Sequence, residues 1–210
     1  DSALDSETTH YWRAQASNSC GDGSVSSAWS FTTLEVPPIL LVDDDDNNPS
    51  VRDHSAAAMG TMGLTYDVWD TQNSDNEPSA TDLAEYSVVI WFTGDEFGGF
   101  SGPGAAGEAA LATWLDNGGC LLISSQDYYW DRGLTGFMSE YLGVGSAESD
   151  VSQSTVTGNG DVFGGMGPYG LVYPFTNYSD RVDPNAGGLV SFVGNQGNAA
   201  VQKETGTYRT

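Results

Sequence analysis

Acidic side chains gather at two places where buried strands are expected to end. They are Asp43, Asp44, Asp45 and Asp46 after the apolar run 39–42, and Asp95 and Glu96 after the apolar run 88–93. Carboxylate oxygens are the ligands that Ca²⁺ and Mg²⁺ prefer, so these two loops predict a divalent-cation site. The alternative is a solvated loop in which one Asp caps the following helix, because the spacing of a dedicated calcium loop is absent.

Ser125 is the one candidate nucleophile that the chain places after a buried strand. The turn at 123–128 reads ISSQDY, with neither a cysteine nor the flanking glycines of a nucleophile elbow. A serine nucleophile needs an imidazole base, and neither His10 nor His54 forms a credible triad with it. We therefore expect no catalysis here. The alternative is a serine hydrolase in which Ser125 works with a histidine beyond residue 210.

A polar and aromatic cluster follows the same strand. It consists of Gln126, Asp127, Tyr128 and Trp130. Aromatic rings beside polar groups can stack on sugar rings or peptide side chains, which predicts a ligand-binding surface. The alternative is that the rings cover the end of the sheet and fill the core.

Strand and helix patterns alternate through the region that must position these residues. Apolar runs predict strands at 39–42, 65–69, 88–93 and 120–124, and helices are expected at 50–62, 81–86 and 105–117. Residues 47–49 read NNP and predict the start of the first helix. The alternation predicts an α/β fold, a flavodoxin-like parallel sheet flanked by helices with strand order 2-1-3-4. Its ligand crevice would lie where the acidic loops meet.

Beyond residue 124 the pattern is looser. We expect a helix at 134–142 and short strands at 151–156, 171–173, 189–193 and 199–202. The chain stops at GTYRT, where another strand pattern begins, so we expect residues 37–210 to be one α/β domain truncated at its C-terminal end.

Residues 1–36 have a different pattern. Two alternating segments, 10–16 and 28–33, flank the turn NSCGDGS, which predicts a β-hairpin. The segments ETTHYWRAQA and SSAWSFTT and the Cys-Gly turn between them resemble the C-terminal end of a fibronectin type III domain. This resemblance implies a fragment of a β-sandwich, joined to the α/β domain by the linker LEVPP at 34–38.

Composition limits the partners. With 29 acidic and 6 basic residues the net charge is −23, which argues against nucleic acids and anionic membrane surfaces. Apolar runs are far shorter than the about 20 residues that span a bilayer, so we expect no membrane insertion. The acidic surface should resist self-association, as in secreted or salt-adapted proteins. Cys20 and Cys120 are expected to be free thiols.

Residues 39–127 resemble the class I glutamine amidotransferase-like fold, most closely its catalytically degenerate versions in large secreted bacterial proteins. The motifs that carry the resemblance are ILLVDDDD, GLTYDVWD, LAEYSVVIWFTGDEF and ALATWLDNGGCLLISSQD. The position of the elbow cysteine falls in the segment Ser124-Ser125-Gln126, and no matching His–Glu pair follows. The acidic residues after the first and third predicted strands also resemble, more weakly, those of phospho-acceptor receiver domains. Such domains need a lysine after the last strand, and the only lysine here, Lys203, lies in the segment AVQKETG, which does not match that pattern.

This resemblance implies a non-catalytic accessory module, a spacer or a ligand-binding domain, of a secreted or cell-surface multidomain protein, for example an exported peptidase. Its partners would be other domains of the same polypeptide and an extracellular glycan or peptide. No cofactor is expected apart from the Ca²⁺ or Mg²⁺ considered above.

Overall fold

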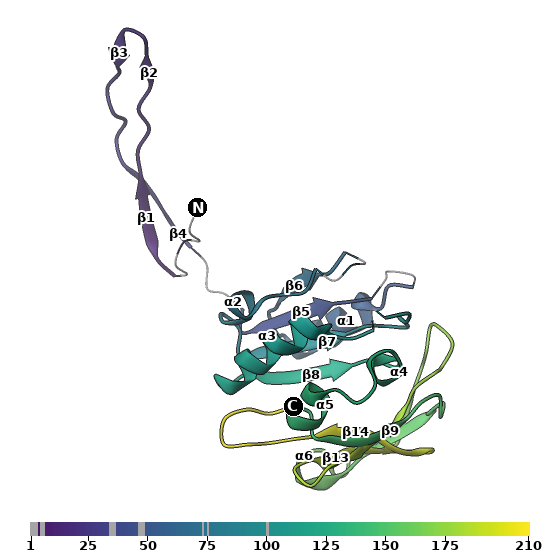
Figure 1. Cartoon of the computed structure of the whole chain (residues 1–210). Coiled ribbons are helices and arrows are strands. Elements are labelled where there is room, and N and C mark those ends of the chain that lie inside the picture. The colour runs from purple at the N-terminus through teal and green to yellow at the C-terminus, as the bar shows by residue number, and fades with distance from the viewer. Residues whose placement is uncertain are drawn as a thin grey trace. The chain divides into compact units, whose positions relative to one another are not determined.

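The structure is a computed structural model of the chain, and it describes residues 4, 7–33, 37–45, 49–72, 74, 76–99 and 101–210 (Figure 1). Contacts divide the chain into two compact units, Asp1–Pro37 and Pro38–Thr210. Within the described residues, no helix is both long enough and apolar enough to cross a membrane.

The first unit is a two-stranded antiparallel ribbon. Strand β1 (Thr9–Trp12) pairs with β4 (Trp29–Thr32), and the short strands β2 (Ser17–Asn18) and β3 (Gly21–Asp22) pair nearer the turn. The paired strands are shorter than the predicted 10–16 and 28–33. Most side chains in the ribbon are exposed, and its relation to a fibronectin type III domain stays a prediction.

The second unit is built on a four-stranded parallel sheet, which confirms the predicted mixed α/β class. The strands are β5 (Ile39–Asp43), β6 (Asp67–Asp70), β7 (Val88–Phe92) and β8 (Cys120–Ser124). Their order, β6-β5-β7-β8, is the predicted 2-1-3-4 and is compatible with a flavodoxin-like fold. Every residue of β5 is buried, as expected for an apolar strand covered on both faces.

Helices cover both faces of this sheet (Figure 1). On one face Leu41 packs with Met59 of α1 (Arg52–Met62). On the other face Val42 and Trp91 join the larger core, which includes Leu111 of α3 (Ala105–Asp116). The two clusters alternate along β5 because successive strand residues point to opposite faces.

The start of α1 corrects the prediction for residues 47–49. Its N-cap position is Val51, which has no capping side chain, and residues 47 and 48 lie outside the described part of the chain. The Val51 amide instead donates to Asp45 Oδ2 at 2.6 Å. A carboxylate from the strand-end loop therefore takes a capping role. The short helix α2 (Ala80–Leu83) does begin at a local cap, a capping box formed by Ser79 and Asp82.

The motif WLDNGG ends α3, and its glycines form a turn that packs against the Trp114 ring. Trp114 donates its Nε1 hydrogen to the Tyr86 carbonyl at 2.9 Å, which joins α3 to the start of β7. Gly118 has φ 105°, a left-handed conformation that favours glycine. A Cβ on Gly119 would lie 2.6 Å from the Trp114 ring. Gly118 is therefore required by the backbone conformation, and Gly119 by packing against Trp114.

The C-terminal third is a β-rich layer with short helices. Its strands are β9 (Val144–Glu148), β10 (Thr155–Gly158), β11 (Tyr169–Gly170), β12 (Arg181–Pro184), β13 (Leu189–Gly194) and β14 (Gly197–Gln202). Its helices are α4 (Tyr128–Arg132), α5 (Gly136–Glu140) and α6 (Gly160–Phe163). One sheet has the order β11-β10-β13-β14, and β12 pairs with β9.

The predictions for this region are partly wrong. Strands at 189–193 and 199–202 are confirmed, the strand at 151–156 is displaced to 155–158, and the helix at 134–142 is shortened to α5. The strand at 171–173 does not form, and Val172 is 91% exposed. Pairing between distant segments overrides the local apolar pattern here. Near the end of the chain, Arg209 forms a parallel bridge with Cys120 at the edge of β8.

Candidate functional site

Ser125 lies at the carboxyl end of β8, in the middle of a hydroxyl cluster. Thr93, which follows β7, donates to Ser125 Oγ at 2.7 Å, and the Oγ atoms of Ser101 and Ser125 are 2.9 Å apart. Ser125 Oγ also accepts the Tyr128 amide at 3.2 Å, which fixes the start of α4. The hydroxyl is thus engaged by the protein itself.

No imidazole meets this hydroxyl within the described part of the chain. His54 lies exposed on α1, and His10 belongs to the ribbon of the first unit. The contacts of Ser125 are the two hydroxyls and one amide. The geometry suits a turn-capping serine, in which Oγ accepts hydrogen bonds instead of giving its proton to a base.

The predicted ligand cluster beside Ser125 is largely covered. Gln126 and Asp127 are each 6% exposed and Tyr128 is 7% exposed. The Tyr128 hydroxyl donates to Glu108 Oε1 at 2.6 Å, and burial together with the Glu108 carboxylate raises the pKa of Tyr128. Only Trp130 is open, at 56%. Three of the four side chains therefore belong to the packed interior, and a sugar or peptide ligand stays a prediction that rests on Trp130.

Gln126 joins the sheet to the C-terminal layer. Its Oε1 accepts the Tyr178 amide at 3.1 Å, and its Nε2 donates to the Thr176 carbonyl at 3.4 Å. A single side-chain amide thus binds two backbone groups of a segment about fifty residues away, with sequence separations of 52 and 50. The turn after β8 is a docking point for that segment.

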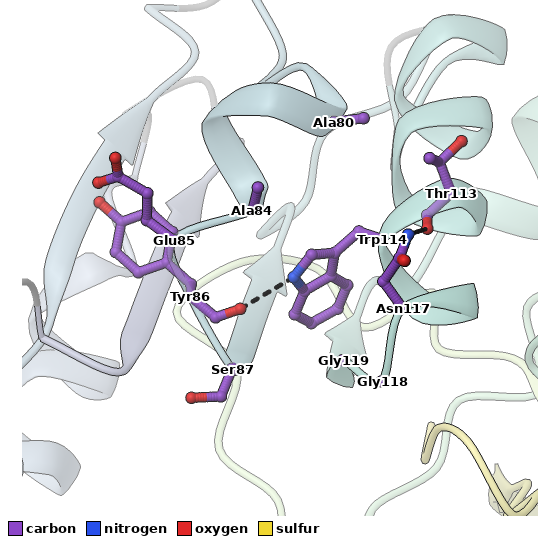
Figure 2. A pocket seen from close by; sticks show the side chains of 10 residues that line it. All are labelled: Ala80, Ala84, Glu85, Tyr86, Ser87, Thr113, Trp114, Asn117, Gly118 and Gly119. Atoms are coloured by element: carbon purple, nitrogen blue, oxygen red, sulfur yellow. Dashed lines mark hydrogen bonds between the residues drawn. The ribbon is translucent and has the colours of Figure 1, made fainter. Parts of the chain in front are cut away.

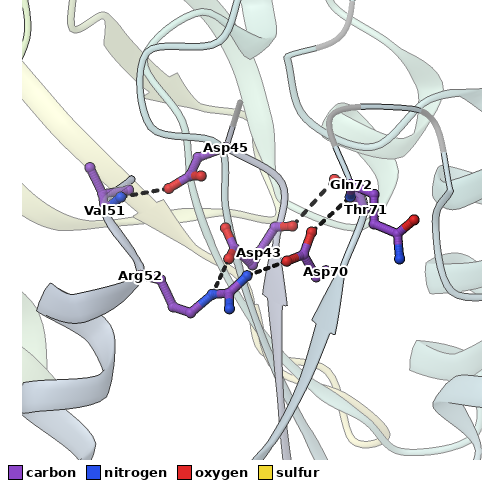
Figure 3. Close-up of polar contacts among 7 residues, drawn as sticks. All are labelled: Asp43, Asp45, Val51, Arg52, Asp70, Thr71 and Gln72. Atoms are coloured by element: carbon purple, nitrogen blue, oxygen red, sulfur yellow. Dashed lines mark hydrogen bonds and ion pairs between the residues drawn. The ribbon is translucent and has the colours of Figure 1, made fainter. Parts of the chain in front are cut away.

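Arg52 occupies the space between the acidic residues at the ends of β5 and β6 (Figure 3). Its guanidinium pairs with both Asp43 and Asp70. Asp43 is 1% exposed, and burial raises its pKa, with the Arg52 hydrogen bond acting against that rise and the Asp45 charge adding to it. Asp43 Oδ1 is buried, and among the residues that the structure describes it has no hydrogen-bond partner.

The other predicted cation ligands have different surroundings. Asp44 accepts the Trp91 indole hydrogen at 2.8 Å, and Asp45 accepts the Val51 amide. Glu96 is 9% exposed, Asp95 is half-buried, and Asp46 lies outside the described residues. Among the residues that the structure describes, no three acidic, histidine or cysteine side chains are grouped so that they could hold a metal ion. The cation site stays a prediction.

Two carboxylates that sequence reasoning missed hold the glycine-rich loop between β7 and α3. Asp131 of α4 accepts amides at about 3 Å from Gly98, Gly99 and Ser101. Glu77 accepts the amides of Gly104 and Gly107 at the start of α3. A glycine-rich loop carries amides that need acceptors, which was the available signal, but nothing local indicates which acid supplies them.

A cavity of about 520 Å³ lies at the opposite end of the sheet (Figure 2). Its lining includes Tyr86, Ser87, Trp114, Asn117 and Gly119, from α2, α3 and the loops that precede β7 and β8. The Trp114 indole hydrogen points to the Tyr86 carbonyl instead of into the space. No predicted site residue lines it.

Comparison with known proteins shows no family and no function for this chain. No family model and no curated protein sequence matches the chain. Two solved structures match: cytoplasmic protein STM3548 from Salmonella typhimurium and cytoplasmic protein STM1381 from Salmonella typhimurium LT2. Each is 11% identical with a TM-score of 0.49 and covers 96% of this chain, and the alignments cover 82% and 83% of those chains.

These matches correct one prediction. Both proteins are described as cytoplasmic, which contradicts the predicted secreted or cell-surface location, and that location is withdrawn. The predicted location was based on the acidic composition and on the exported multidomain proteins in which degenerate amidotransferase-like modules occur. An acidic surface is also explained by solubility alone. The resemblance to amidotransferase-like and fibronectin type III domains stays a prediction.

Proposed function

We propose that Pro38–Thr210 is a non-catalytic accessory module, a spacer or ligand-binding domain of the amidotransferase-like type, within a multidomain polypeptide. The observation that carries the proposal is the use of the Ser125 hydroxyl. It accepts the Thr93 hydroxyl at 2.7 Å and the Tyr128 amide at 3.2 Å, so it organises the turn in which an active relative would hold its nucleophile.

The cover over this turn supports the same proposal. Gln126 next to Ser125 is 6% exposed and is bound to the backbone of Thr176 and Tyr178. A catalytic elbow must admit a substrate carbonyl and present amide donors to the developing oxyanion. Here the side chain next to Ser125, that of Gln126, is instead bound to the backbone of the C-terminal layer.

The alternative, a serine hydrolase, requires Ser125 to give its proton to an imidazole. Ser125 already accepts two hydrogen bonds, so its own proton is directed to Ser101 Oγ, 2.9 Å away. A hydrolase would need that proton to go to a base instead. The two proposals therefore predict different effects of removing Ser125 Oγ: a loss of stability alone, or a loss of hydrolytic activity.

The test measures hydrolysis of glutamine, a nitrophenyl ester and a peptide by the wild-type chain, Ser125→Ala and the exposed control Ser146→Ala. We expect no activity above buffer for any of them. Ser125→Ala should lose about 1–3 kcal/mol of unfolding free energy in denaturant titration, because the buried Thr93 hydroxyl loses its partner. Ser146→Ala should be nearly neutral. Hydrolysis that disappears in Ser125→Ala alone would defeat the proposal.

We further propose that the ribbon of the first unit belongs to a fibronectin type III-like sandwich. The β1–β4 register places His10, Trp12, Trp29 and Phe31 on one face, with His10 stacked on Phe31 and Trp12 against Trp29. The other face is mainly polar, and Thr9 and Thr32 are hydrogen-bonded across it. An isolated two-stranded ribbon is marginally stable, so an aromatic face of this kind suits the inside of a two-layer sandwich.

A further inference from the structure

The segment 176–180 connects the parallel sheet to the C-terminal layer. On the sheet side it is bound by Gln126, as described above. On the other side the Ser152 amide donates to the Ser179 carbonyl at 3.1 Å, and the Gln153 amide donates to Ser179 Oγ at 2.8 Å. Asn177 adds two bonds on this side: its carbonyl accepts the Ser152 hydroxyl at 3.1 Å, and its Nδ2 donates to the Gln153 carbonyl at 2.7 Å. The segment makes no strand pairing of its own, so side-chain and backbone hydrogen bonds of this kind hold it.

A carboxyl group lies at each side of this docking point. Asp127 follows Gln126 in the turn after β8 and is 6% exposed. Asp180 ends the segment, is half-buried, and accepts the Asp150 amide at 3.1 Å. The two groups come from the two layers that the segment joins.

The charges that act on these two groups are all negative. Asp127 feels Asp131 from α4, Asp150 from the loop after β9, and Asp95 from the loop after β7. Asp180 feels Asp127 and Asp150. Asp131 keeps its own charge balanced by three backbone amides. Two ionised carboxylates at this point would therefore repel each other, and no cationic group among the described residues is found to act on either, which opposes the docking.

We propose that Asp127 and Asp180 form a pH-sensitive latch, in which protonation holds the segment 176–180 on the turn after β8 and ionisation releases it. The proposal is independent of whether the module binds a ligand. It concerns the attachment of one layer to another, and it needs only the carboxyl pair, the Gln126 contacts and the surrounding acidic groups.

The direction of the pH effect follows from the pKa values. Burial is the main cause that raises the pKa of Asp127 to about 6 and the pKa of Asp180 to about 7, from 3.8 for both. Hydrogen bonds from Gln126 to Asp127 and from the Asp150 amide to Asp180 act against the rise, and the neighbouring carboxylates add to it. The docked state thus binds protons more tightly than the released state. Its extra stability is fully present near the ordinary pKa and is lost as the pH rises through the raised values.

The test is amide hydrogen exchange on the wild-type chain between about pH 5 and about pH 8. The reporters are the Ser152, Gln153 and Tyr178 amides, which donate across the docking point. After correction for intrinsic exchange, their protection should fall about tenfold or more over this range. Amides in β5 and β7 should keep their protection, because the opening is local.

Variants separate the latch from a general effect of charge. Asp127→Asn with Asp180→Asn keeps the side-chain shape and removes the titrating groups, so reporter protection should become independent of pH. Asp161→Asn, at an exposed position in α6, is the control and should keep the wild-type response. Flat protection in the wild-type chain, an unchanged response in the double variant, or an equal loss of protection in β5 would each overturn the proposal.

Discussion

Arg52 lies between two carboxylates of very different exposure. Asp43 is almost fully buried, whereas Asp70 is more than a third exposed and Arg52 itself is about a third exposed. Breaking a buried pair by removing one partner is strongly destabilising, because the other charge stays buried without compensation. Arg52 therefore matters more for Asp43 than for Asp70.

Arg52→Gln should lower the free energy of unfolding by about 1–3 kcal/mol near neutral pH, since Asp43 loses its cation. Removing Arg52 also removes what opposes the raised pKa of Asp43, so the loss should shrink as the medium becomes acidic and Asp43 is protonated. Urea titrations at two pH values measure both effects.

The control is Arg209→Gln, whose pair with Glu204 is well exposed on both sides, at 70% and 60%. Exposed pairs contribute little, so this variant should stay within about 0.5 kcal/mol of the wild-type chain. Equal losses in the two variants would show that Arg52 stabilises nothing through Asp43.

At the scale of elements, the parallel sheet could be predicted and the C-terminal layer could not. Strand β5 is a continuous apolar run that ends in acidic residues, and β7 and β8 are also mainly apolar runs. Such strands are determined by their own composition. Strand β12 reads RVDP, with two charged residues and a proline, and it forms only because β9 lies beside it.

The candidate site, like the fold, could be predicted only in part: its place in the sheet could be predicted, but its long-range contacts could not. Strand order correctly put Ser125 and the acidic loops at one edge of the sheet, because parallel strands end together. The contacts of Gln126 with Tyr178, and of Asp131 with the glycine-rich loop, join residues far apart in the chain. No periodicity or local motif encodes those partners. Burial of the cluster was one of the two interpretations of the sequence, but the residues that bury it could not be predicted.

The end of α3 offers a test at this scale. Gly119→Ala would place a Cβ 2.6 Å from the Trp114 ring, so it should destabilise the chain by about 1–3 kcal/mol through overpacking. Gly60→Ala, within α1 and with nothing inside 4 Å of its Cβ, should instead stabilise by about 0.5–1 kcal/mol. Thermal unfolding distinguishes the two, and a harmless Gly119→Ala would contradict the packing reason given for the motif.

For the molecule as a whole, the net charge is the feature that determines how stability responds to salt. A charge of −23 on 210 residues makes the folded state repel itself, and salt screens that repulsion. The buried carboxylates near Asp43 add a local part to the same effect. Screening and specific binding of a cation can be separated, because screening depends on ionic strength alone.

The melting temperature should rise by several degrees between low salt and about 0.5 M NaCl as the charges are screened. Choline chloride, with a bulky cation, should act equally. CaCl₂ or MgCl₂ at matched ionic strength tests the predicted cation site. A further rise beyond the sodium value would reveal binding by mass action, and its absence at millimolar metal would remove the site.

The paired indoles of the ribbon should give the first unit its own circular dichroism signal. Trp12 and Trp29 have ring centroids 4.6 Å apart, with planes inclined by 33°. Transitions in two chromophores held this close and at a fixed angle couple, and coupled transitions produce a paired positive and negative band in circular dichroism. The two rings therefore act as a built-in spectroscopic label for the ribbon, readable without any added dye.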